Sequence, residues 1–113
     1  MSRIEDRFTQ LRSAGRTGLV TYVTAGDPDL TRSAEIIKRL DQAGADVLEI
    51  GVPFSDPLAD GPVIQRATER ALAAGTTLTG VLGMLGTIRP AVSAPIVIFS
   101  YANPIRSEEH TSE

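Results

Sequence analysis

The segment Leu48–Gly61 reads LEIGVPFSDPLADG and is the most informative stretch of the chain. Its apolar first part predicts a strand that carries one carboxylate, Glu49, in its middle. A loop follows that Pro53 and Pro57 stiffen, and it ends on a second carboxylate, Asp60. Two carboxylates held at one strand end by a stiff loop are suited to acid–base chemistry. The segment therefore predicts an acid–base pair.

The alternation of side chains along a strand assigns Glu49 to one face of the predicted sheet. Glu49 shares its face with Val47, and Leu48 and Ile50 point to the other face. If helices cover the face of Leu48 and Ile50, Glu49 points to the opposite side. In a closed barrel that side is the interior.

Around this segment, predicted helices and strands alternate along the chain. The predicted strands are 18–24, 46–51 and 95–101, and the predicted helices begin near Ser2, Asp29, Pro62 and Thr77. The strand at 95–101 is almost continuously apolar, which predicts burial on both faces. This alternation predicts an α/β fold with parallel strands and right-handed crossovers. Three strands fit the first part of a (β/α)8 barrel or of an open doubly wound sheet.

Composition narrows the class of protein. The 113 residues suffice for one small domain, and the net charge of −3 without a basic cluster argues against a nucleic-acid partner. The chain has no cysteine, and its single histidine, His110, lies in a polar tail, which argues against a metal site. The charged N-terminus is unlike a signal peptide, and no apolar run is long enough to cross a membrane. We therefore expect a soluble cytoplasmic protein.

The last eight residues differ from the rest. Residues 106–113 read RSEEHTSE, contain no apolar side chain and follow directly on a predicted buried strand. One back-translation of this segment resembles the start of a common sequencing-library adapter. Our hypothesis is that residues 1–105 are the N-terminal part of one domain and that 106–113 are not native. The alternative is a genuine disordered terminus.

Four blocks together resemble the tryptophan synthase alpha chain family: VTYVTAGDPD, LDQAGADVLEIG, FSDPLADGPVIQRA and SYANPI. The resemblance extends over residues 1–105. It implies a (β/α)8 TIM barrel, of which this chain would hold about three of the eight strands. It also implies a lyase of tryptophan biosynthesis, which cleaves indole-3-glycerol phosphate to indole and glyceraldehyde 3-phosphate by a retro-aldol step. The family uses no metal or cofactor for this step; pyridoxal phosphate is expected only on a partner beta chain, in an α2β2 assembly.

The resemblance also implies roles for particular residues. Glu49 would carry the proton for indole C3, and Asp60 would stabilise the charge that develops at the indole N–H. Tyr22 would lie against the indole ring. The positions that would contact the beta chain are Pro53, Asp56 and Asn103. Because barrel phosphate sites come from the loops after strands seven and eight, we expect this chain alone to be inactive.

Simpler interpretations remain open. A glutamate within a strand often faces solvent, Asp60 would suit the cap of the helix near Pro62, and Asp56 would suit an Asx-turn. At the level of the whole protein, the alternatives are another phosphosugar-handling TIM-barrel enzyme and a non-catalytic fragment that only binds a partner.

Overall fold

The computed structural model describes residues 2–55 and 61–100, and the other residues are not discussed structurally. Helices and strands alternate as the sequence predicts. In chain order the elements are α1 (Arg3–Ala14), β1 (Val20–Thr24), α2 (Leu30–Gln42), β2 (Val47–Gly51), α3 (Pro62–Ala73), α4 (Leu78–Ile88), a 3-10 turn (Arg89–Ala91) and β3 (Ile96–Phe99).

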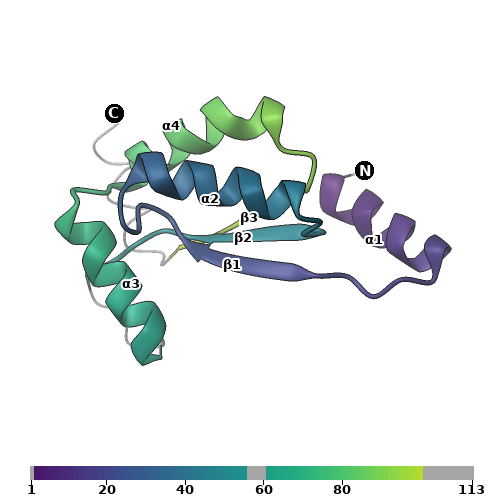
Figure 1. The fold of residues 1–113 in the computed structure, drawn as a ribbon, viewed down its shortest axis with the longest axis horizontal. Coiled ribbons are helices and arrows are strands. Elements are labelled where there is room, and N and C mark those ends of the chain that lie inside the picture. Colours follow the sequence, from purple (N-terminus) through teal and green to yellow (C-terminus); the bar gives the residue numbers. More distant parts are fainter. Residues whose placement is uncertain (1, 56–60, 101–113) are drawn as a thin grey trace.

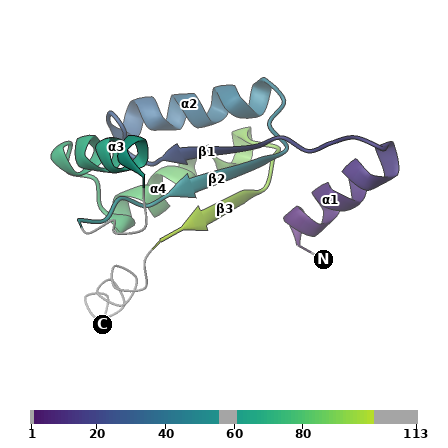
Figure 2. The same ribbon diagram turned by 90° about the horizontal axis from the view of Figure 1, so that it is seen from below.

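The three strands form one parallel sheet in the order β1-β2-β3, which confirms the predicted α/β fold (Figure 1). Helices α2 and α4 lie on one face of this sheet. Helix α1 lies near the N-terminal ends of the strands, and α3 lies near their C-terminal ends. Figure 2 shows the strands running in the same direction, so their C-terminal ends share one edge.

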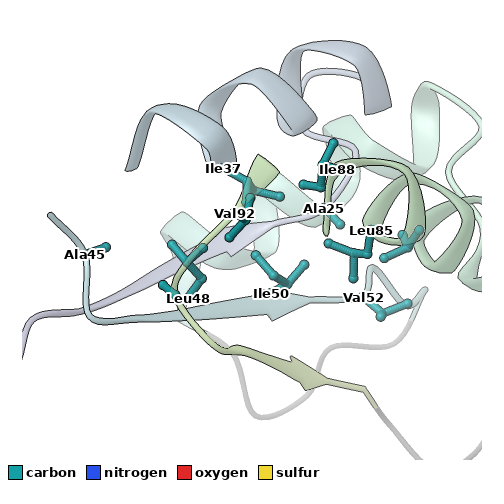
Figure 3. Close-up of a cluster of buried hydrophobic side chains, with 11 residues drawn as sticks. Ala25, Ile37, Ala45, Leu48, Ile50, Val52, Leu85, Ile88 and Val92 are labelled. Carbon is teal, nitrogen blue, oxygen red and sulfur yellow. The ribbon is translucent and has the colours of Figure 1, made fainter. Parts of the chain in front are cut away.

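The core lies between the sheet and helices α2 and α4 (Figure 3). Its largest fully buried apolar side chains are Ile37 of α2, Leu48 and Ile50 of β2, and Val81 of α4. This arrangement confirms that Leu48 and Ile50 point to the helices. Glu49 therefore points to the opposite face, which we call the open face.

Local signals set the helix ends where the sequence predicts them. The Ser2 hydroxyl accepts a hydrogen bond from Glu5 N–H at 3.2 Å, and the Thr77 hydroxyl accepts one from Gly80 N–H at 3.0 Å. Gly15 ends α1 with a φ of 66°, a left-handed conformation that glycine adopts without strain.

A polar cluster around Asp46 lies at the N-terminal end of the sheet. The Asp46 carboxylate, which is nearly buried, accepts a hydrogen bond from Leu19 N–H at 2.8 Å. It also lies 3.5 Å from a guanidinium nitrogen of Arg7 and 3.4 Å from one of Arg16. The Leu19 hydrogen bond and then the two guanidinium charges hold the pKa of Asp46 below its usual value, although burial opposes this. The cluster joins α1 to the start of β2.

The expected burial of the third strand on both faces is wrong for the described chain. The side chains of Ile98 and Phe99 are 44% and 51% exposed. β3 is an edge strand of the described sheet, and no helix after it lies within residues 61–100 to cover Ile98. The strand is also shorter than expected, because it ends at Phe99.

Among the described residues no single helix is long and apolar enough to cross a membrane. Only α3 and the segment 78–91 together have the length and apolar composition of a membrane span, and these two segments are bent by 93° relative to each other.

Candidate active site

Glu49 lies in the middle of β2 on the open face, where it is half-buried. Its register neighbours are Tyr22 on β1 and Val97 on β3, so Glu49 lies between the two flanking strands. The structure thus places two of the predicted site residues, Glu49 and Tyr22, opposite each other on adjacent strands.

A second aromatic side chain adjoins Tyr22 on the open face. The ring centroids of Tyr22 and Phe99 are 6.5 Å apart, and the ring planes are inclined by 56°. Such tilted pairs are favourable because the edge of one ring meets the electron-rich face of the other. We call the two rings the aromatic ledge. Sequence reasoning did not place Phe99 in the site.

Gly51 explains how rings from β1 and β3 reach each other across β2. A side chain at Gly51 would collide with the Tyr22 hydroxyl, and its Cβ would lie 2.6 Å from Tyr22 Cζ. The phenol end of Tyr22 therefore occupies the space that a side chain at position 51 would need. Phe99 is the register partner of Gly51 on β3, so the ledge extends over all three strands.

An ion pair braces the C-terminal edge of the sheet. Arg70 of α3 donates to both carboxylate oxygens of Asp27, at 2.8 and 3.0 Å, and the Asp27 partner raises the pKa of the guanidinium. Beside it, Gly26 approaches Thr76 so closely that a Cβ would lie 2.6 Å from Thr76 Cγ2. These contacts hold α3 against the loop after β1. No local sequence pattern predicts the contact of Arg70 with Asp27 or the contact of Gly26 with Thr76.

The remaining predicted residues differ in what the structure says of them. Pro53 is the second residue after β2 and is buried, and its contact with a partner chain stays a prediction. Asp56, Asp60 and Asn103 lie outside the described residues. Within the described ranges, no three His, Cys, Asp or Glu side chains gather in a way that could hold a metal ion. The candidate site in the described part of the chain is Glu49, in the middle of β2, with the aromatic ledge next to it. The ledge reaches the C-terminal ends of β2 and β3, the edge of the sheet where barrel enzymes hold their catalytic groups.

Comparison with known proteins identifies the family. A family model described as tryptophan synthase alpha chain matches residues 8–112. The tryptophan synthase alpha chain of Carboxydothermus hydrogenoformans is 57% identical over 105 residues, and that of Citrifermentans bemidjiense is 53% identical over 105 residues. Each alignment covers 93% of this chain and 39% of the relative, so this chain spans about two fifths of their length.

Solved structures agree with the sequence comparison. The crystal structure of tryptophan synthase subunit alpha from Legionella pneumophila superposes with a TM-score of 0.92 at 42% identity, covering 96% of this chain and 42% of that one. The three parallel strands are therefore part of a TIM barrel, which confirms the predicted fold class. With a family match over nearly its whole length and this structural agreement, the chain belongs to the tryptophan synthase alpha chain family.

Proposed function

We propose that this chain is the N-terminal part of a lyase that cleaves indole-3-glycerol phosphate to indole and glyceraldehyde 3-phosphate, with Glu49 as its proton carrier. The observation that carries the proposal is the placement of Glu49. It lies on the open face of β2, next to Tyr22 and beside the aromatic ledge. A flat aromatic substrate on this ledge would hold its reacting carbon within reach of the carboxyl group.

The proposed reaction needs one proton delivered and one removed. The Glu49 carboxyl group protonates indole C3, which weakens the bond from C3 to the glycerol chain. As that bond breaks, its electron pair returns to the ring. The adjacent hydroxyl gives its proton to the Glu49 carboxylate that the first transfer left behind, and its carbon becomes the aldehyde. The protonated ring carries positive charge at its nitrogen, and we assign the stabilisation of that charge to Asp60.

The proposal also covers the phosphate site, the partner chain, the location and the native part of the domain. The phosphate group would be held by barrel loops that this chain does not contain. The partner would be a tryptophan synthase beta chain, reached through Pro53, Asp56 and Asn103, and the location would be the cytoplasm. We also propose that residues 1–105 are the native part of the domain.

A chimera makes the proposal testable. In it, the aligned residues of this chain replace their counterparts in the Carboxydothermus hydrogenoformans alpha chain, whose remaining sequence completes the barrel. We expect the chimera to release indole from indole-3-glycerol phosphate. Glu49→Gln should lower kcat by at least about a hundredfold, because the amide cannot deliver the proton.

The matched control is Glu35→Gln, which changes an exposed glutamate on the outer side of α2. It should leave kcat and KM unchanged. A folded chimera without lyase activity, or a Glu49→Gln variant with full activity, would overturn the proposal.

A further inference from the structure

We propose that Gly51 is a positioning residue that seats the Tyr22 ring against Phe99 and so builds the wall that recognises a planar aromatic substrate. The geometry itself is independent of the reaction. Its consequence for substrate recognition rests on the proposed lyase function.

Gly51 is unusual for its place in the fold. It ends β2, the central strand, where a residue without a side chain weakens a sheet through its extra backbone freedom. Its φ is not in the left-handed region, whereas those of Gly15, Gly26, Gly44 and Gly75 are. Backbone conformation therefore does not require glycine at position 51. The requirement comes from the lack of room for a side chain there.

The space above Gly51 is filled by Tyr22. Ideal Cβ placement at Gly51 puts this atom in collision with the Tyr22 hydroxyl, 2.6 Å from Cζ and 3.2 Å from Cε2. Tyr22 comes from β1, and its register partner on β2 is Glu49, two residues before Gly51. The ring thus leans along β2 toward the C-terminal edge, and Phe99 meets it from the other side.

This arrangement couples Gly51 to recognition and leaves the proton carrier in place. Even an alanine at position 51 would push the Tyr22 ring off β2 and away from Phe99. Glu49 would keep its place in the strand, because its backbone pairing with β1 and β3 does not involve the ring. The loss should therefore appear mainly as weaker substrate binding.

The kinetic test uses Gly51→Ala, Tyr22→Leu and the double variant in the chimera. We expect Gly51→Ala to raise KM about tenfold, while kcat changes less than about threefold. In the Tyr22→Leu background, Gly51→Ala should have little further effect, because the colliding ring is gone. Additive effects on KM would overturn the proposal.

The control is Gly86→Ala, which adds the same methyl group at an exposed position of α4, where the new Cβ would meet no atom within 4 Å beyond its chain neighbours and the backbone of its own helix. It should not change KM. If Gly51→Ala does not fold, the double variant decides: it should melt at the temperature of Tyr22→Leu alone. A double variant as unstable as Gly51→Ala would show that the collision is not with Tyr22 and would overturn the proposal.

A second readout does not depend on activity. In an NMR spectrum of the chimera, the Gly51 Hα protons should show nuclear Overhauser effects to the Tyr22 Hε protons, and the Tyr22 and Phe99 rings should show mutual nuclear Overhauser effects. Gly51→Ala should abolish the ring-to-ring effects, and their survival would overturn the positioning role. If the chimera has no lyase activity but the spectra behave as expected, the proposed function fails and the positioning role of Gly51 stands.

Discussion

Asp46 accepts a hydrogen bond from Leu19 N–H at 2.8 Å, and this contact joins the residue before β2 to the residue before β1. It ties the two strands together at their N-terminal ends. Gly51 lies at the other end, as the last residue of β2. The nearby guanidinium groups of Arg7 and Arg16 favour the charged form of the carboxyl group. The sequence places Asp46 close to the candidate acid–base pair, but the structure makes it an anchor for α1.

The lowered pKa of Asp46 predicts how stability depends on pH. A carboxyl group whose pKa is lower in the folded than in the unfolded state stabilises the fold above the unfolded value, about 3.9, and loses this contribution as the pH falls through the folded value. Asp46→Asn in the chimera should therefore lower Tm at pH 7. The difference from the parent should shrink as the pH falls below about 4.

Thermal melts at a series of pH values check this prediction, with Glu69→Gln as the control for removing an exposed charge. Glu69 lies on the exposed side of α3. A Tm difference for Asp46→Asn that is the same at pH 7 and pH 3 would contradict the assigned role of the charge.

How far sequence reasoning reaches depends on the range of each interaction. Alternation along β2 correctly placed Glu49 opposite Leu48 and Ile50, because it needs only neighbouring residues. The pairing of Tyr22 with Glu49 depends on the register between two strands, which no local pattern specifies. The ring of Phe99 was missed for the same reason, since its contact with Tyr22 crosses an intervening strand.

Long-range polar contacts were also beyond sequence reasoning. The ion pair of Asp27 and Arg70 joins residues 43 positions apart, and nothing in either local pattern indicates its partner.

The burial expected for β3 failed for a related reason. The apolar sequence of β3 predicts burial on both faces, but the described residues supply no element that covers the exposed side chains of Ile98 and Phe99.

Gly26 should be the glycine least tolerant of alanine among those described. Its φ of +87° disfavours any side chain, and a Cβ would collide with Thr76. Gly26→Ala should lower the free energy of unfolding of the chimera by at least about 2 kcal/mol, since strain and overpacking add. Urea unfolding measures this loss.

The comparison for Gly26 is Gly44→Ala, where φ is +109° but no atom beyond the chain neighbours lies within 4 Å of the new Cβ. It should cost only the conformational strain, about 1–2 kcal/mol. Equal losses in the two variants would mean that the contact with Thr76 contributes nothing to the requirement for glycine.

Ile37 and Ile36 are adjacent on α2 and provide a matched test of the core. Ile37 is fully buried between α2 and the sheet, and Ile36 is 39% exposed. Ile37→Ala should lower the free energy of unfolding by about 2–5 kcal/mol, because it removes buried apolar surface and leaves a cavity. Ile36→Ala should cost about 1 kcal/mol or less. A reversed order, measured by urea unfolding of the chimera, would contradict the assignment of the buried face of α2.

The open face predicts how the 113-residue chain behaves without the rest of a barrel. Its exposed apolar side chains include Val20 and Tyr22 on β1 and Phe99 on β3, and both outer strands of the described sheet have an edge without a partner strand. Unpaired edges and exposed apolar faces promote association between chains.

We expect the isolated chain to bind a hydrophobic dye strongly, to self-associate in sedimentation experiments, and to show no indole release. The chimera, whose added strands cover the same face, should be free of dye binding under the same conditions. A monomeric isolated chain with a cooperative melt would show that this part of the barrel folds without its open face being covered.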